Sequence, residues 1–217
     1  LEFRRVLFRS GITGKMVSGK TTLAEYLVRE HGFTRVSLAD PIKELESIQA
    51  HVPDALVTQK LRPIINNLVE KKQRHELEKW LMETFAKYPK MPGEKNRDLL
   101  QTLGHQARER YGNGIWVNYA LKRSKQYDNV VIDDMRYQNE ALLLRSSGFS
   151  IWRIEISKDT QRRRLLSIYG PQMLEFTDHP SETNLDTGWD LFDHVINGDD
   201  SPKELFEAAR RILEDAA

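Results

Sequence analysis

The residues best suited to chemistry lie near the start of the chain, where residues 14–22 read G-K-M-V-S-G-K-T-T. This segment fits G-x-x-x-x-G-K-[ST], a pattern in which two glycines let main-chain N–H groups turn toward phosphate oxygens. Lys20 is placed to reach the β- and γ-phosphates of a nucleotide, and the Thr21 hydroxyl suits Mg²⁺. The predicted binding residues are Gly14, Val17, Ser18, Gly19, Lys20, Thr21 and Thr22.

The residues around this segment favour a phosphate site over the alternative, a glycine turn that binds nothing. Apolar residues precede it, and Leu23, Leu27 and Val28 follow at helical spacing up to Gly32. A helix that begins near Lys20 directs the positive end of its dipole at the same anion.

Two carboxylates end the most apolar run of the chain, Asn129-Val-Val-Ile-Asp-Asp134, which is typical of a buried parallel strand. Asp133 at that position can hold Mg²⁺ opposite Thr21, directly or through water. The alternative is an ordinary helix N-cap. We predict Thr21 and Asp133 as metal ligands.

Several cations are expected near strand ends, where they suit phosphate groups. Arg136 follows the carboxylates, Arg97 starts a helix, and Lys43 comes just after the turn at Asp40 and Pro41. The triplet at 162–164 precedes a polar stretch up to Gly188, as in a lid that carries cations to a phosphoryl group. For each cation alone, a solvated surface charge is the alternative.

The chain shows no evident nucleophile paired with a base. His179 has no partner at metal-ligand spacing, so we expect it to order a loop. This pattern fits phosphoryl transfer to an acceptor that is already anionic, where catalysis consists of alignment and charge neutralisation.

Strands and helices alternate along the chain, which predicts an α/β fold with a parallel sheet covered on both faces. We expect strands at 33–38, 129–134, 149–156 and 194–197, with the first strand before Gly14. Residues 42–88 are helical in pattern and read as an insertion, and Asp40 is expected to cap its first helix. Ligands of such sheets bind at the carboxyl ends of the strands.

Composition narrows the class of protein. The chain has 217 residues with net charge +1 and no cysteine, which excludes disulfides and thiolate sites and gives no support for a nucleic-acid partner. No apolar run approaches the ~18 residues of a membrane span. A reducing, cytoplasmic setting is compatible with this composition. Residues 1–10 are expected either to supply the first strand or to be a non-native remnant.

Taken together, several segments resemble the deoxynucleoside monophosphate kinases of the bacteriophage type. The resemblance is carried by residues 14–27, G-F-T-R-V-S-L-A-D-P-I-K-E from Gly32, R-D-L-L-Q-T-L-G from Arg97, I-W-V-N from Ile115, V-V-I-D-D-M-R-Y-Q-N-E from Val130, and D-H-P-S-E from Asp178. The family often has Asp where Thr21 stands, and Met135 and Tyr137 also depart from its pattern. Residues 1–10 do not match its opening strand.

The resemblance implies a three-layer P-loop kinase with a five-stranded parallel sheet, a helical monophosphate-binding region at 42–96 and a lid at 157–188, all in a single domain. It implies ATP and Mg²⁺ as cofactors, a deoxynucleoside monophosphate as acceptor, and the cytoplasm of a bacterial or phage-infected cell. The implied catalytic residues are Lys20, Arg136, Arg162 and Arg163. The implied acceptor-binding residues are Asp40, Ile42, Lys43, Arg97, Asp134 and Arg136.

Two alternatives stay open at this point. One is a related kinase of a phosphorylated metabolite, such as phosphomevalonate or dephospho-coenzyme A. The other is a nucleotide-binding module without turnover. We expect no nucleic-acid or membrane partner, and a homodimer is left open.

Overall fold

A computed structural model describes residues 7–177 and 180–216. Its chain divides into two compact units, one formed by Leu1–Ser37 with Ser124–Ala217 and the other by Leu38–Arg123. Among the described residues, no helix has both the length and the apolar character needed to span a bilayer.

The first unit is built on a five-stranded sheet in which every pairing is parallel. The strand order is β2-β3-β1-β4-β5. The strands are β1 (Arg9–Gly14), β2 (Thr34–Arg35), β3 (Val130–Ile132), β4 (Ser150–Glu155) and β5 (His194–Asn197). Because β1 pairs with β3 on one side and β4 on the other, the segment after Gly14 leaves the centre of the sheet.

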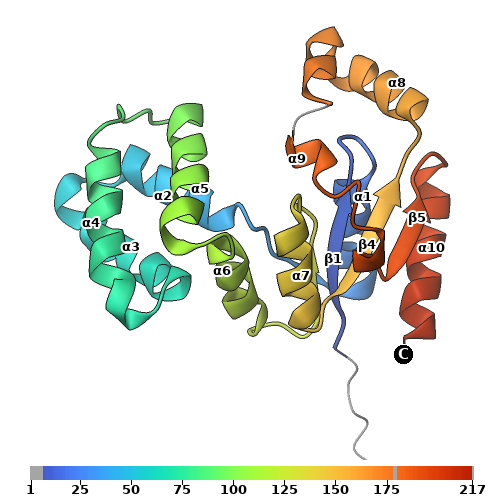
Figure 1. The fold of residues 1–217 in the computed structure, drawn as a ribbon, viewed down its shortest axis with the longest axis horizontal. Coiled ribbons are helices and arrows are strands. Elements are labelled where there is room, and N and C mark those ends of the chain that lie inside the picture. The colour runs from blue at the N-terminus through green and yellow to red at the C-terminus, as the bar shows by residue number, and fades with distance from the viewer. Residues whose placement is uncertain (1–6, 178–179, 217) are drawn as a thin grey trace, which may run out of the picture. The chain divides into compact units, whose positions relative to one another are not determined.

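Helices cover both faces of this sheet. They are α1 (Lys20–His31), α7 (Gln138–Ser146), α8 (Lys158–Tyr169), α9 (Pro180–Thr183) and α10 (Pro202–Asp215), with 3₁₀ turns at Pro171–Phe176 and Trp189–Leu191. Leu23 and Leu27 of α1 share a core with Ile12, Trp152 and residues of α10. On the other face α7 packs against β4. Figure 1 shows β1, β4 and β5 side by side, with α10 next to β5.

The second unit is helical and has a core of its own. It contains α2 (Asp40–His51), α3 (Asp54–Leu68), α4 (Arg74–Phe85), α5 (Arg97–Tyr111) and most of α6 (Ile115–Ser124), with a 3₁₀ turn at Lys71–Gln73. Leu45, Leu61 and Leu81 are fully buried in its core, and Trp116 is 1% exposed and donates its indole N–H to the Gly104 carbonyl. Asn96 caps α5 by accepting from the Leu99 amide.

Most elements expected from the sequence are confirmed, and three differ. The strand predicted at 33–38 is only Thr34–Arg35, although Phe33, Val36 and Leu38 are buried. The stretch before Gly188 was expected to be a loop, but it contains a 3₁₀ turn and α9. Asp40 is not the cap of α2: it is the first helical residue, after Ala39, and Ala39 provides no side-chain cap.

Candidate active site

The loop between β1 and α1 has the backbone shape that its glycines predict. Gly14 has a φ of 150° and Gly19 a φ of 105°, and Val17 between them also takes a positive φ of 57°. A Cβ on Gly14 would lie 2.4 Å from the Ile154 carbonyl oxygen of the neighbouring strand, so a side chain there does not fit. The loop thus depends on glycine both for backbone conformation and for its close approach to β4.

The start of α1 is suited to an anion. The helix begins at Lys20 after Gly19, and its first turn holds no acidic side chain. The unpaired main-chain N–H groups and the positive end of the helix dipole are therefore not neutralised from within the helix. The exposed Thr21 and Thr22 place two hydroxyl groups at the same helix end.

Lys20 lies back over the loop that precedes it. Its Nζ donates to the carbonyl oxygens of Gly14 and Lys15, both at 2.7 Å. Burial lowers the pKa of Lys20 to about 8, and the nearby Arg136 lowers it as well, whereas the carboxylates of Glu182 and Asp133 raise it. An incoming phosphate would supply the negative charge that favours the ammonium form.

A cavity of about 470 Å³ opens beside this loop. Its walls come from the loop and first turn of α1, the end of α8, and the connection from β5 into α10. The lining residues are Val17, Ser18, Gly19, Lys20, Thr21, Thr22, Arg164, Ile168, Tyr169, Gly198, Asp200, Ser201, Pro202 and Leu205. Six of the seven residues predicted to bind the nucleotide are among them, and Gly14 instead lines a smaller cavity with Arg136.

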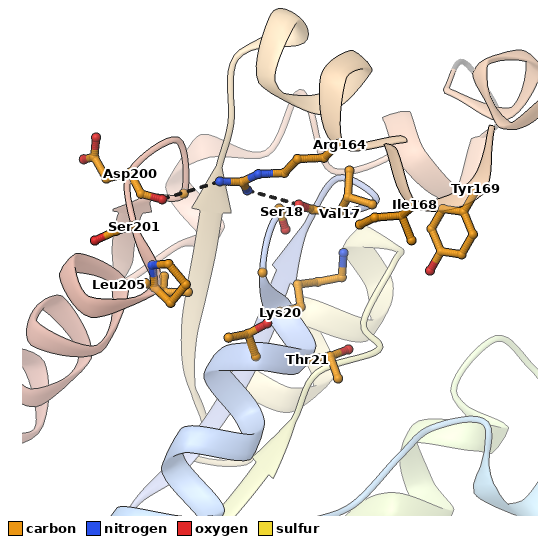
Figure 2. A pocket seen from close by; sticks show the side chains of 14 residues that line it. Val17, Ser18, Lys20, Thr21, Arg164, Ile168, Tyr169, Asp200, Ser201 and Leu205 are labelled. Atoms are coloured by element: carbon orange, nitrogen blue, oxygen red, sulfur yellow. Dashed lines mark hydrogen bonds between the residues drawn. The ribbon is translucent and has the colours of Figure 1, made fainter. Parts of the chain in front are cut away.

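Arg164 closes one side of the large cavity. Its guanidinium donates to the Val17 carbonyl at 3.2 Å and to the carbonyls of Asp199 and Asp200 at 3.4 Å. Figure 2 shows Arg164 reaching across the loop from α8, with Lys20 and Thr21 below it. Arg162 and Arg163, the two predicted catalytic arginines of this triplet, are exposed. The structure therefore places the third arginine, not the first two, at the phosphate loop.

The end of β3 carries the two predicted carboxylates, and both have partners in the same unit. Asp133 accepts from Arg35, with Nε at 2.8 Å and Nη2 at 2.6 Å from its two oxygens. Burial raises the pKa of Asp133, and the hydrogen bonds from Arg35 oppose that rise. Asp134 accepts from the Ser37 hydroxyl at 2.6 Å.

The donor groups at this site fit Mg²⁺ held mainly by substrate. Among the residues described, no group of three or more His, Asp or Glu side chains is arranged to hold a metal ion. Mg²⁺ usually keeps several waters and binds through one or two protein oxygens plus substrate phosphates. The Thr21 hydroxyl suits that arrangement, whereas direct coordination by Asp133 would compete with its ion pair to Arg35.

The remaining predicted residues are divided between the two units. Arg136 follows β3, and its Nη1 lies 2.6 Å from Glu182 Oε1. The other four belong to the helical unit: Asp40, Ile42 and Lys43 begin α2, and Arg97 begins α5. Within that unit, Glu46 of α2 accepts from the main-chain N–H of Asn96, next to Arg97. His179 lies outside the described residues.

Sequence reasoning missed four contributors to the site. Arg35 gave no signal, because it looked like an ordinary strand residue. Glu182 was noticed only as part of a motif. Arg164 was grouped with its neighbours, although helical spacing from the buried Thr160 and Gln161 distinguishes it. The connection at 198–202 was not singled out.

Comparisons with known proteins add a structural likeness only. No protein-family model matches the chain, and no curated protein matches it either. Among solved structures, it is similar to an unliganded sugar kinase from Janibacter sp. HTCC2649, with 14% sequence identity and a TM-score of 0.45. That match covers 96% of this chain and 95% of the other. A likeness at this level does not indicate a shared reaction, so the function is argued from the site.

Proposed function

We propose that the chain is a phosphotransferase that moves the γ-phosphoryl group of ATP to a deoxynucleoside monophosphate. The observation that carries this proposal is the loop itself: a lysine and an uncapped helix start face a cavity of about 470 Å³. The choice of acceptor rests on the family resemblance of the sequence motifs.

The shape of the cavity supports a nucleotide that extends away from the phosphate loop. The phosphates would lie against residues 17–22, where main-chain amides, Lys20 and the dipole of α1 favour anions. The base and sugar would then lie between Ile168 and Tyr169 on one side and residues 198–205 on the other. Arg164 would contact the nucleotide from above the loop.

In the proposed step, an oxygen of the acceptor monophosphate attacks the γ-phosphorus of ATP. The bond from that phosphorus to the β–γ bridging oxygen breaks, and ADP leaves with the electron pair. The attacking oxygen is already ionised, so no general base is required. Lys20 and Arg136 stabilise the charge that spreads over the γ-phosphoryl oxygens.

Mg²⁺ would neutralise charge on the β- and γ-phosphates when bound, with the Thr21 hydroxyl as its protein ligand and Asp133 or Asp134 able to act through water. The acceptor is proposed to use Arg136 together with Asp40, Ile42, Lys43 and Arg97. The assignment of those four residues of the helical unit remains a prediction from the sequence.

A panel assay tests this proposal. Purified protein is mixed with ATP, Mg²⁺ and one acceptor at a time, drawn from the deoxynucleoside and ribonucleoside monophosphates, phosphomevalonate and dephospho-coenzyme A, and release of ADP is followed. We expect ADP release that depends on a deoxynucleoside monophosphate and is lost in K20A. Release with only another acceptor, or with none, would overturn the assignment.

A further inference from the structure

Glu182 of α9 joins two parts of the site that are far apart in the chain. Its side chain is only 4% exposed. One carboxylate oxygen accepts from Arg136 Nη1 at 2.6 Å, and the other accepts from the main-chain N–H of Met16 at 2.6 Å. A single carboxylate therefore bridges the phosphate loop after β1 and the arginine after β3.

The segment that carries Glu182 is itself fastened to the phosphate loop and the sheet. Lys15 Nζ donates to the Glu182 carbonyl at 2.8 Å and also pairs with the Asp186 carboxylate. Buried Arg153 of β4 donates to the Leu185 carbonyl at 2.5 Å. Contacts to main chain on either side of the carboxylate hold it in place, so the bridge does not depend on a freely moving side chain.

Arg136 is held at both ends by this arrangement. Glu140 Oε2 accepts from the main-chain N–H groups of Arg136 at 2.8 Å and Tyr137 at 3.1 Å, which fixes the backbone. Glu182 fixes the guanidinium. The Arg136 side chain nevertheless remains 45% exposed, so part of its fork of donors is open to a ligand.

Resting on the proposed function, we propose that Glu182 is a positioning residue for phosphoryl transfer. It holds the Arg136 guanidinium against the phosphate loop, so that Arg136 meets the transferring group without reorienting. Donors that are oriented before the reaction stabilise developing charge without a reorganisation cost during it. The carboxylate acts through Arg136 and the loop, not by touching the reacting atoms.

The competing explanation is that Glu182 occupies the place of a phosphate and must leave when the nucleotide binds. The position of the residue favours the first explanation. Glu182 lines a small separate cavity with Thr13, Gly14 and Arg136, on a different lining from the large cavity beside Thr21 and Leu205. Its charge is also compensated in place by Arg136.

Kinetics of E182Q test the proposal, with E175Q as the matched control because Glu175 is an exposed carboxylate of the same region. We expect E182Q to lower kcat about 10- to 100-fold through misplacement of Arg136, with KM for ATP within about threefold of wild type. E175Q should match wild type. The double variant E182Q/R136A should be no slower than R136A alone, since both changes remove one unit.

Two results would overturn the proposal: losses in E182Q and R136A that multiply in the double variant, or binding of ADP that is more than about tenfold tighter in E182Q, as displacement of a phosphate stand-in requires. Thermal unfolding checks that each variant is folded. Should E182Q not fold, E182D serves in its place, because it keeps the charge with a shorter reach.

A spectroscopic readout separates this proposal from the proposed function. In ¹⁵N-labelled protein, the Arg136 guanidinium should give resolved N–H resonances in wild type because its rotation is restricted. R136K assigns them, and E182Q should lose them. Unchanged resonances in E182Q would overturn the positioning role. If wild type phosphorylates no acceptor, the proposed function fails, while these resonances still decide whether Glu182 orders Arg136.

Discussion

Arg35 and Asp133 form a two-point ion pair between β2 and β3, with Nε 2.8 Å from Oδ1 and Nη2 2.6 Å from Oδ2. The Asp133 side chain is 2% exposed, so Arg35 supplies most of what compensates the loss of water around this carboxylate. The pair lies at the end of β3, just before the segment that carries Arg136.

Replacing Arg35 with Ala should destabilise the protein by about 1–3 kcal/mol, because a buried carboxylate loses its donors. Burial already raises the pKa of Asp133 and Arg35 opposes the rise, so the pKa should rise further in R35A. A carboxyl group with a raised folded-state pKa costs stability above that pKa, and the cost falls as the group becomes protonated.

The deficit of R35A in the free energy of unfolding should therefore be larger near about pH 7.5 than near about pH 5. Urea unfolding at the two pH values measures it. The control is R29A, since Arg29 pairs with Glu30 on the surface and should change stability by less than about 0.5 kcal/mol. A deficit of R35A that grows at the lower pH would contradict this account.

Lys20 should impose an upper pH limit on nucleotide use. Because its pKa is lowered to about 8, the ammonium form is lost as the pH rises through that value in the free enzyme. We expect kcat/KM for ATP to fall about tenfold per pH unit well above it. K20A should lower kcat/KM by at least about 10²-fold at every pH while the circular dichroism spectrum stays unchanged. A flat profile up to about pH 10 would show that Lys20 does not titrate in this way.

Arg164 and Arg163 should differ sharply although they are adjacent. Arg164 contacts the Val17 carbonyl and lines the large cavity, whereas Arg163 is exposed. We expect R164A to raise KM for ATP about tenfold or more, the effect of losing a charge-assisted contact. R163A should stay within about twofold. Steady-state kinetics with ATP varied give both values, and the reverse order would restore the arginine assignment made from sequence.

Gly198 should be intolerant of any side chain. A Cβ there would lie 2.6 Å from Ile154 Cγ2 and 2.8 Å from the Ser18 carbonyl oxygen. We expect G198A to cost about 1–3 kcal/mol of stability through overpacking and to weaken ATP binding, because the phosphate loop must shift.

The control for G198A is G104A in helix α5. Its Cβ would meet only Ile42 at 3.6 Å, an ordinary contact, and alanine favours the helix by up to about 1 kcal/mol. Thermal unfolding and calorimetry with ADP compare the two variants. Equal ADP affinity in G198A and wild type would show that the phosphate loop tolerates the displacement.

Sequence reasoning succeeded where a feature is local. The glycine spacing around Lys20 and the apolar residues at 130–132 each fix a conformation within a few residues, and both are found in the structure. The pairing of Arg35 with Asp133 spans 98 positions and depends on how β2 aligns with β3. The contact from Met16 to Glu182 spans 166 positions. Such pairs are set by tertiary packing, which propensity and spacing do not encode.

The choice among the three arginines of α8 was a different kind of failure, because the information was present. Arg164 lies four residues after Thr160 and three after Gln161, both buried, so all three share one face of the helix. The phase of the helix thus selects Arg164 from the chain alone, once its start at Lys158 is known.

Part of the large cavity is contributed by the last strand and helix of the chain. Pro202 and Leu205 form its wall opposite α8, and Leu205 Cδ2 would lie 3.1 Å from a Cβ on Gly19. A nascent chain that has emerged only as far as β4 owns the phosphate loop but lacks this wall. The capacity to retain a nucleotide should therefore arise late in biosynthesis, after α10 has docked, and unfinished chains on the ribosome should not sequester ATP.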